Sequence, residues 1–562
     1  MKKISGSEAV MMSLVAEGVD TIFGYPGGAI MPIYDALYDF KDQIKHILVR
    51  HEQGASHAAE GYARMRGVPG VCFATSGPGA TNLVTGIADA MLDSVPIVCI
   101  TGQVASHLLG TDAFQETDII SITIPITKWN CQVTKAEDIP NAIAKAFYIA
   151  NTGRPGPVLI DITKDAQIGM LDYEYKKITN LPTVKIPGVP DEKDILAASE
   201  LINNAKKPLI LAGHGVLIAN AQSELVEFSN KTGIPVACTL HGLSSFPTGH
   251  KNYIGMLGMH GNYGANFLTN DADVIIAVGM RFDDRVTGTL STYLPQSKVI
   301  HIEVDPAEIA KNVKPEVSLI SDAKRALTAL LNKVKANNHN DWINSFRDCD
   351  EQENQKVINP AVNYSGDMPR MIKTIDVISK KTKGKAVIVA DVGQHQMIAA
   401  RYYKFDQPNS FVTSGGLGTM GFALPAALGC KVASPKREVV AIIGDGSFQM
   451  TLQEMAVLAQ DNIAVKVVVL NNNFLGMVRQ WQELFFDKRY SFVDLVNPNF
   501  IKLAEGFGIP ARQVTDNKDL ESAVDEMLAA KTPFFLEVVV EKEDNVFPMV
   551  PAGCGVKDVR LE

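Results

Sequence analysis

Residues Gly444 to Asn473 read GDGSFQMTLQEMAVLAQDNIAVKVVVLNNN, and this stretch decides the fold. The continuous apolar run 439–443 and the run 465–470, which is apolar except for Lys466, predict two buried strands, with a helix between them. Asp445 and Asn472 follow these strands, at the sheet edge where open α/β sheets bind ligands. Their carboxylate and amide oxygens suit Mg²⁺ that also holds a diphosphate. Ser447 and the glycine amides at the helix start would hold phosphate oxygens.

This Gly-Asp-Gly…Asn-Asn arrangement resembles that of enzymes that use thiamine diphosphate (ThDP). A lone Gly-Asp-Gly is usually only a tight turn, whereas the whole strand-turn-helix-strand unit is specific. Glu52, in Arg50-His51-Glu52-Gln53-Gly54-Ala55, would on its own be a favourable partner of a helix dipole. Beside the 444–473 unit, we expect Glu52 to hydrogen-bond the aminopyrimidine ring and so help to remove the thiazolium C2 proton.

The bulk composition predicts a globular cytoplasmic protein. The net charge of −9 comes without a basic block, so nucleic acid and anionic membranes are not expected partners. No uninterrupted apolar run approaches the length that spans a bilayer. The seven cysteines are odd in number and form no Cys-x-x-Cys pair, which predicts reduced thiols without a structural zinc site.

Alternating strands and helices predict three α/β blocks with parallel sheets, over 1–177, 193–340 and 370–562. A linker over 178–192 carries three prolines, as expected at a domain boundary. The polar run 337–367 lacks apolar periodicity, which predicts a solvated connector with one helix. No sequence repeat relates the first block to the third.

The chain closely resembles the catalytic subunits of acetohydroxyacid synthases, also called acetolactate synthases, over nearly its whole length. The most specific matches are the runs RHEQGA (50–55), GTDAFQE (110–116), RFDDRVTG (281–288) and GMVRQW (476–481). The resemblance implies three doubly wound domains: pyrimidine-binding, central FAD-binding and diphosphate-binding. It implies an enzyme that decarboxylates pyruvate on ThDP and transfers the two-carbon unit to a second pyruvate or to 2-ketobutyrate. The pathway would be valine, leucine and isoleucine biosynthesis.

The same resemblance implies a homodimer or homotetramer, in which Glu52 of one subunit faces the diphosphate domain of another, and a separate small regulatory subunit. It gives FAD a bound but non-redox role. It assigns the metal ligands as Asp445, Asn472 and the carbonyl of Phe474, and the catalytic residues as Glu52, Gln115 and Lys164. The substrate residues would be Phe114, Asp284, Arg285 and Trp481.

For ThDP and its diphosphate, the implied contacts beyond Glu52 are Val392, Gly393, Gln394, His395, Gly418, Met420, Gly444, Asp445, Gly446, Ser447, Asn472, Gly476 and Met477. For FAD they are Arg154, Gly213, Thr239, Leu240, His260, Gly279, Arg281, Asp283, Glu303 and Asp322. Without the resemblance, Lys164 and Arg285 would be assigned to surface salt bridges, Glu303 and Asp322 to ordinary strand ends, and Met420 to the core.

Three alternatives stay open at this point. One is the catabolic acetolactate synthase, which lacks FAD, and the run 281–288 and Trp481 argue against it. Another is a flavin-dependent pyruvate oxidase, which would consume oxygen. The third is a non-catalytic homologue, which would be expected to lack Glu52 or Asp445, and both are present.

Overall fold

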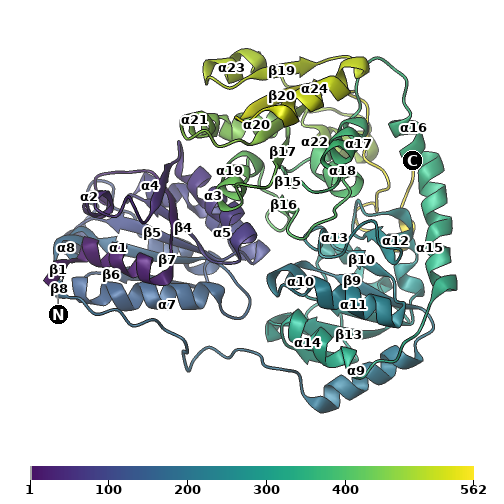
Figure 1. Cartoon of the computed structure of the whole chain (residues 1–562), viewed down its shortest axis with the longest axis horizontal. Helices are drawn as coiled ribbons and strands as arrows, with labels where there is room; N and C mark the ends of the chain where they lie inside the picture. Colours follow the sequence, from purple (N-terminus) through teal and green to yellow (C-terminus); the bar gives the residue numbers. More distant parts are fainter. Residues whose placement is uncertain (1–2) are drawn as a thin grey trace.

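Three parallel six-stranded sheets follow one another along the chain in the computed structural model, which describes residues 3–562. Helices flank each sheet (Figure 1). The predicted α/β fold with three parallel-sheet domains is therefore confirmed. An additional antiparallel pair, β1 (Lys3–Ser5) with β8 (Met170–Asp172), ties the two ends of the first domain together.

The first sheet has the strand order β3-β2-β4-β5-β7-β6. Its strands are β2 (Thr21–Gly24), β3 (Lys45–Leu48), β4 (Gly70–Ala74), β5 (Ile97–Gln103), β6 (Trp129–Val133) and β7 (Val158–Thr163). Its helices are α1 (Gly6–Glu17), α2 (Met31–Tyr38), α3 (Glu52–Arg66), α4 (Pro78–Asn82), α5 (Val84–Asp93), α6 (Ile119–Thr123), α7 (Ile139–Asn151) and α8 (Lys164–Ile168).

The middle sheet has the order β11-β10-β9-β12-β13-β14. Its strands are β9 (Pro208–Ala212), β10 (Val236–Cys238), β11 (Tyr253–Met256), β12 (Val274–Val278), β13 (Lys298–Glu303) and β14 (Val317–Ile320). Its helices are α9 (Glu192–Asn204), α10 (His214–Ile218), α11 (Gln222–Thr232), α12 (Tyr263–Phe267), α13 (Asp284–Thr287) and α14 (Ala323–Leu331).

The third sheet has the order β16-β15-β17-β18-β20-β19. Its strands are β15 (Val387–Ala390), β16 (Phe411–Thr413), β17 (Val439–Gly444), β18 (Lys466–Asn471), β19 (Ala511–Val514) and β20 (Phe534–Val539). Its helices are α16 (Asn359–Val362), α17 (Met371–Thr382), α18 (Gln394–Tyr402), α19 (Ala423–Ala433), α20 (Asp445–Thr451), α21 (Met455–Gln460), α22 (Gly476–Phe485), α23 (Phe500–Gly506) and α24 (Asn517–Ala529).

Strand order shows where each sheet can bind a ligand. Counted within each domain, the first and third sheets both run 2-1-3-4-6-5, although no sequence repeat relates them. The middle sheet runs 3-2-1-4-5-6, the order of dinucleotide-binding domains. In such sheets ligands bind where the strand order reverses. That point lies between β9 and β12 in the middle sheet, and between β15 and β17 in the third.

The first and third domains dock through α3 and α19, and their apolar side chains form one continuous core. Small residues let the two helices approach closely. A Cβ added at Gly61 of α3 would collide with the carbonyl oxygen of Ala426, and one at Gly429 of α19 with that of Ala58. The first domain is therefore held directly against the domain that carries Asp445.

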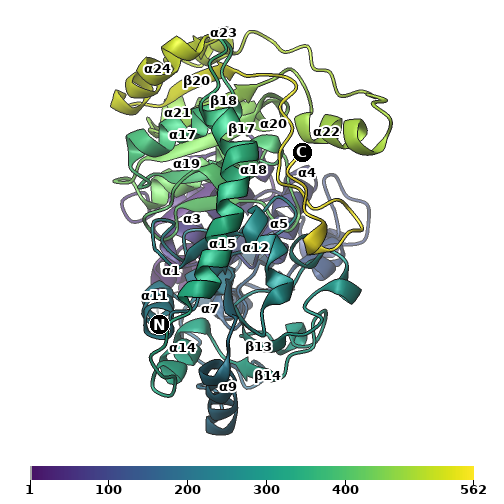
Figure 2. The ribbon, with the colours of Figure 1, turned by 90° about the vertical axis from the view of Figure 1, so that its right-hand side faces the viewer.

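The two predicted connectors differ in structure. The linker between β8 and α9 is extended and crosses from the first domain to the middle one (Figure 1). The run 337–367 contains α15 (Asn340–Glu353), which extends lengthwise along one side of the molecule (Figure 2). This helix is not simply solvated, because Trp342, Phe346 and Cys349 are buried in a middle-domain core. Three buried side chains among many polar ones gave too weak a periodic signal for the sequence to indicate this packing.

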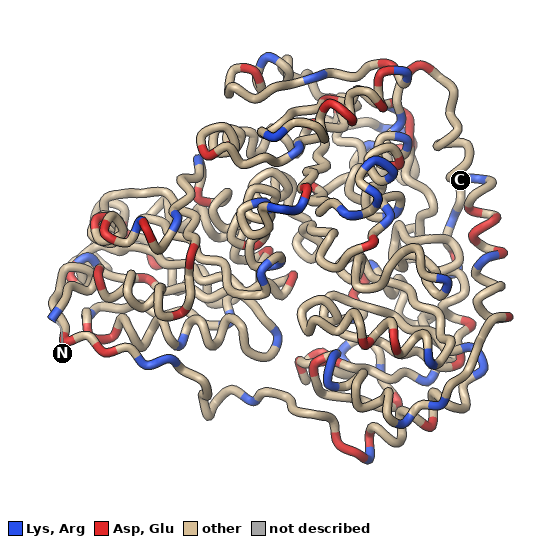
Figure 3. Tube along the Cα trace, viewed as in Figure 1, with Lys and Arg blue, Asp and Glu red and all other residues tan. Residues whose placement is uncertain are grey.

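Lys and Arg are interspersed with Asp and Glu along the whole trace (Figure 3). Within residues 3–562, none of the helices combines the length and apolar composition that crossing a membrane requires. All seven cysteines are free thiols, as expected.

Candidate functional site

A cavity of about 50 Å³ lies at the carboxyl ends of β15, β17 and β18, at the point where the strand order of the third sheet reverses. All three predicted metal ligands, Asp445, Asn472 and Phe474, line it. The remaining predicted diphosphate contacts that line it are Val392, Gly393, Gln394, His395, Met420, Gly444, Gly446, Ser447, Gly476 and Met477. Gly418 lines the larger neighbouring cavity instead.

Asp445 is buried at the start of α20, and Asn497 donates a hydrogen bond to its Oδ2 at 2.7 Å. Burial raises the pKa of Asp445 to about 6, against the opposing hydrogen bond from Asn497. A divalent cation beside this carboxylate would favour its charged form. Asn497 also bonds the side chains of Asn471 and Asn473, at 3.0 and 3.1 Å. The sequence did not indicate Asn497, because it reaches the site from an irregular segment.

Glycines form part of the wall of this cavity, and side chains of the same domain pack closely against them. A Cβ at Gly393 or Gly444 would lie 2.7 Å from the His395 ring, and one at Gly476 would lie 2.9 Å from Asn472 Nδ2. Burial lowers the pKa of His395 to about 3, so the imidazole is neutral. Among residues 3–562, His395 Nε2 finds no hydrogen-bond partner. An oxygen-rich cation site, a backbone cradle and a buried unpartnered nitrogen fit a metal-bound diphosphate.

A second cavity, of about 990 Å³, lies over the switch point of the middle sheet. It is lined by nine of the ten residues predicted to contact FAD: Arg154, Thr239, Leu240, His260, Gly279, Arg281, Asp283, Glu303 and Asp322. Gly213 lies directly behind this wall, where its amide donates to the carbonyl of Val278 at 2.9 Å. A Cβ on Gly213 would collide with the carbonyl oxygen of Gly279, so both glycines are needed for the strand ends to approach.

The polar groups of this cavity fit a dinucleotide. Glu303 is the last residue of β13, and burial raises its pKa to about 7. The backbone amides of Val304 and Asp305 donate hydrogen bonds to its carboxylate and partly offset this rise. A carboxylate at the end of such a strand is suited to ribose hydroxyls. Burial lowers the pKa of His260 to about 4, and His260 Nδ1 is unpartnered among the described residues. The volume, the strand order and these groups together fit a dinucleotide.

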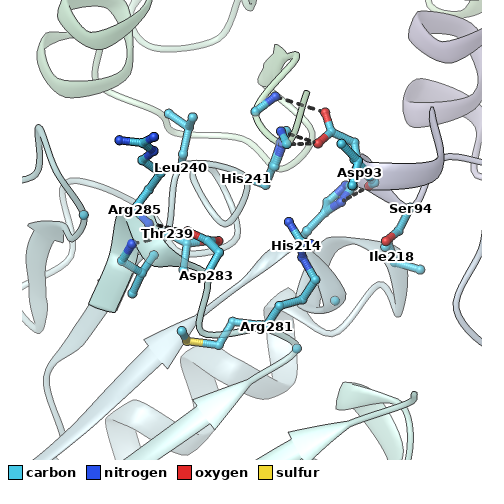
Figure 4. Close-up of a pocket in the computed structure, with 18 of the residues that line it drawn as sticks. Asp93, Ser94, His214, Ile218, Thr239, Leu240, His241, Arg281, Asp283 and Arg285 are labelled. Atoms are coloured by element: carbon cyan, nitrogen blue, oxygen red, sulfur yellow. Dashed lines mark hydrogen bonds and ion pairs between the residues drawn. The ribbon is translucent and has the colours of Figure 1, made fainter. Parts of the chain in front are cut away.

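The two cavities adjoin. Val392, Gly393, Met420, Met477 and Val478 line both, so a ligand in one approaches a ligand in the other. The predicted substrate residues Asp284, Arg285 and Trp481 line the larger cavity. Trp481 lies on α22 with its ring 5.2 Å from that of Phe485, and Arg285 is exposed, 3.4 Å from Asp284. Figure 4 shows Arg285 beside Leu240 at the edge of the cavity.

Glu52 lies elsewhere on this chain. It begins α3, is buried, and its Oε2 accepts a hydrogen bond from Asn82 at 2.9 Å. A Cβ at Gly79 would lie 3.2 Å from Glu52 Oε1, and one at Gly77 would lie 2.8 Å from the carbonyl oxygen of Gln115. The glycine-rich turn 76–82 therefore brings Glu52 and Gln115 to one place.

The other two predicted residues of the first domain are exposed. Phe114 has 88% of its surface exposed, and Lys164 begins α8 at the carboxyl end of β7. Neither these residues nor Glu52 and Gln115 line the two cavities. The predicted site is thus present as two separate halves in one chain.

A buried group that the sequence did not indicate lies at the wall of the larger cavity. Asp93, at the end of α5, lies 2.9 Å from His241 Nε2 (Figure 4) and forms an ion pair with Arg64 at 2.8 Å. Ser94 follows it and accepts a hydrogen bond from Arg154 at 2.8 Å. These partners come from distant segments, so neither periodicity nor a motif could have predicted the contacts.

Three family matches cover most of the chain, each described as a domain of a "Thiamine pyrophosphate enzyme". They are the N-terminal TPP binding domain over residues 4–122, the central domain over 195–330 and the C-terminal TPP binding domain over 391–538. The fold, the site and these matches define a thiamine diphosphate-dependent enzyme.

Full-length relatives narrow the class. The chain is 46% identical to the acetolactate synthase large subunit of Corynebacterium glutamicum, over 100% of this chain and 90% of the relative. It is 45% identical to the acetolactate synthase isozyme 2 large subunit of Escherichia coli, over 98% of both. It is 45% identical to an acetolactate synthase of Nicotiana tabacum, over 99% of this chain and 85% of the relative. The chain belongs to the acetolactate synthase large-subunit family, and the predicted family and enzyme class are confirmed.

Proposed function

We propose that this acetolactate synthase holds ThDP and Mg²⁺ at the end of the third sheet and FAD over the middle sheet. It joins the two-carbon unit of pyruvate to a second pyruvate or to 2-ketobutyrate, as a step toward the branched-chain amino acids. The observation that carries this proposal is the adjoining pair of cavities at two switch points, lined by the residues that the sequence predicts.

The residues of the small cavity would hold the diphosphate end. Asp445, Asn472 and the carbonyl of Phe474 offer hard oxygen ligands to Mg²⁺. Gly393 and Gly444 carry no side chains, so phosphate oxygens could approach the backbone beside the His395 ring. When bound, ThDP supplies the electron sink that lets the carbon–carbon bond of pyruvate break as CO₂ leaves. Met420 and Met477 exclude water where the two cavities meet.

The acceptor ketoacid would enter from the larger cavity. Arg285 is a cation with an exposed guanidinium that can pair with the carboxylate of a ketoacid. Trp481 offers a flat apolar surface to the remaining alkyl group of the acceptor. FAD would serve as a structural wall of this channel, because the reaction makes no net change in oxidation state.

Glu52 would complete the site of a second copy. Its carboxylate is buried beside Asn82 and Gln115 in the first domain and does not line either cavity of its own chain. A carboxylate so placed can hold and share a proton with an aminopyrimidine nitrogen that a second chain presents. Phe114 and Lys164 are exposed on the same domain, where a partner would cover them. The relatives named "large subunit" support a separate small regulatory subunit.

Product analysis tests this function directly. Protein reconstituted with ThDP, Mg²⁺ and FAD is given pyruvate, with and without 2-ketobutyrate, while oxygen is monitored. We expect 2-acetolactate from pyruvate alone, 2-aceto-2-hydroxybutyrate when both are present, and no stoichiometric oxygen uptake. Acetate formation with oxygen consumption would show a pyruvate oxidase instead. Full activity in protein that neither contains nor binds flavin would show the catabolic enzyme.

A further inference from the structure

Asp93 lies where the three domains meet. Its side chain is fully buried at the end of α5. Besides the ion pair with Arg64 of its own domain, Asp93 Oδ1 lies 2.9 Å from Nε2 of His241 in the middle domain. It also accepts hydrogen bonds from the backbone amides of Gly415 and Gly416 in the third domain, at 3.1 and 2.7 Å. One carboxylate thus holds elements from all three domains.

The carboxylate is charged. Burial alone would raise the pKa of Asp93, but His241 and Arg64 beside it lower the pKa well below its usual range. A buried charge of this kind is stable only while its partners stay in place. Displacing His241, or the amides of Gly415 and Gly416, would therefore destabilise the buried carboxylate and weaken its hold on the remaining partners.

The loop 414–420 depends on Asp93 for its position. A Cβ at Gly416 would lie 2.8 Å from Asp93 Oδ1, and one at Gly415 would collide with the His241 ring. The loop therefore rests directly on both side chains. It ends in Met420, which lines both the 50 Å³ cavity proposed for the ThDP diphosphate (the diphosphate cavity) and the 990 Å³ cavity proposed for FAD (the flavin cavity). Moving the loop moves Met420 in both sites.

Two histidines beside Asp93 also line the flavin cavity. His214 and His241 both line that cavity, with their rings stacked 5.4 Å apart. His214 Nδ1 lies 3.2 Å from the backbone carbonyl oxygen of Asp93 (Figure 4). A ligand that fills the cavity contacts the two imidazoles that bracket Asp93, and so restricts them.

We infer that Asp93 is a positioning residue that couples the two cavities, so that flavin binding strengthens ThDP binding. Flavin restrains His214 and His241, these hold the end of α5, and Asp93 holds the loop that carries Met420 against ThDP. This inference rests on the proposed use of FAD and ThDP. It adds a function for the flavin in a reaction that needs no redox chemistry.

Asp89 supplies a matched control. It lies one turn before Asp93 on the same face of α5, and its Oδ1 accepts a hydrogen bond from Ser414 of the same loop at 2.7 Å. Burial first, and then Glu60 and Asp93, raise the pKa of Asp89 well above its usual range. Asp89→Asn keeps an acceptor for Ser414, whereas Asp93→Asn removes the carboxylate that pairs with Arg64.

The test measures ThDP affinity by calorimetry at saturating Mg²⁺, with and without FAD, on the full chain and both variants. For the unmodified chain we expect FAD to tighten ThDP binding by about 5–150-fold, the usual range of coupling between sites. The measured quantity is the ratio of ThDP affinity with FAD to ThDP affinity without FAD. In Asp93→Asn this ratio should fall to within about threefold of one, while Asp89→Asn should keep the ratio of the unmodified chain. Linkage requires ThDP to tighten FAD binding by the same factor, which a flavin fluorescence titration checks.

A ratio in Asp93→Asn equal to that of the unmodified chain would overturn the inference, as would a ratio of one in the unmodified chain. If Asp93→Asn does not fold by circular dichroism, His241→Gln breaks the same link from the flavin side and is expected to lower the ratio equally. Equal losses in both aspartate variants would indicate general damage to the loop and also overturn the inference. Failure of the unmodified chain to bind flavin would contradict the proposed function instead, and the titration detects this separately.

Discussion

At the scale of single residues, Asp445 has the most direct of the proposed chemical roles. It is a buried carboxylate among the three predicted metal ligands, with a pKa raised to about 6 by burial. Asp445→Asn keeps the shape and removes the charge that a divalent cation needs. Removing one member of a buried charge pair costs about 3–5 kcal/mol, so we expect ThDP affinity with Mg²⁺ to fall by about 10²–10⁴-fold.

Calorimetric titration of ThDP in the presence of Mg²⁺ measures this loss. Asp487→Asn, a change at an exposed acid outside both cavities, should leave the affinity unchanged. Equal affinities in Asp445→Asn and the unmodified chain would remove Asp445 from the metal site.

Trp481 is expected to select the acceptor ketoacid. It lines the larger cavity near its junction with the diphosphate site, where it can contact the additional methyl group of 2-ketobutyrate. One methylene in an apolar pocket discriminates by about 1–3 kcal/mol, or about 10–200-fold. Trp481→Leu should therefore lose most of the preference for 2-ketobutyrate while still forming acetolactate from pyruvate.

A competition assay with both ketoacids measures the product ratio. Trp342→Leu is the matched control, since Trp342 is buried in α15 away from the site and should affect the melting temperature alone. If Trp481→Leu likewise lowers only the melting temperature and keeps the product ratio, Trp481 is a structural residue.

Residues of the site differed in how well the sequence could indicate them. Asp445 and Asn472 could be placed together because each directly follows a buried strand, and parallel strands end at one edge of the sheet. Asn497 and Asp93 could not. Their partners lie on segments that meet them only after the domains have docked, so no local pattern records the contact.

At the scale of elements, strands with continuous apolar runs were predictable, and two polar edge strands were not. The runs 70–74 and 274–278 are continuous apolar stretches, and both strands match these bounds in the structure. β6 and β19 were not predicted because they lie at sheet edges, with polar and partly exposed residues along much of their length. The sequence also did not predict that α3 packs against α19. The need for glycine at Gly61 and Gly429 becomes visible only when the facing helix is in place.

The contact between α3 and the third domain makes stability depend on pH. Glu454 is fully buried there and accepts the amide of Arg50, with its two oxygens 3.1 and 3.3 Å away. Burial raises the pKa of Glu454 to about 7 from an ordinary value of 4.5. Because the folded chain holds this proton more tightly than the unfolded chain, stability falls as pH rises from 4.5 through 7. The contribution of this one group is about 3 kcal/mol.

Glu454→Gln keeps an acceptor for Arg50 and cannot ionise. The unfolding free energy of this variant, minus that of the unmodified chain, should therefore rise by about 3 kcal/mol between pH 5 and pH 8. Urea unfolding at the two pH values measures the difference, and Glu521→Gln on the exposed face of α24 should show no such change. A pH-independent difference for Glu454→Gln would contradict the assignment.

At the scale of the whole molecule, two domains with one strand order carry the two halves of the proposed site. The third domain places Asp445 at its switch point, and the first places Glu52 beside the glycine-rich turn 76–82. In one chain the two halves do not share a cavity. A two-fold dimer would unite them twice, because each subunit meets the other with the same surface.

Mixing two inactive variants tests this arrangement. Glu52→Gln loses the proton-sharing carboxylate, and Asp445→Ala loses the metal site. In a dimer that contains one of each, one site carries both changes and the other carries neither. If equal amounts are unfolded together and refolded, half of the dimers are mixed, so about one quarter of the full activity should return.

The control refolds each variant alone, and both should stay inactive. Size-exclusion chromatography with light scattering must show dimers or larger assemblies in all three samples. No recovery of activity from a mixture that forms such assemblies would mean that each chain builds its site from its own residues. Glu52 would then have to reach Asp445 by a rearrangement of the first domain against the third, which the close crossing of α3 and α19 opposes.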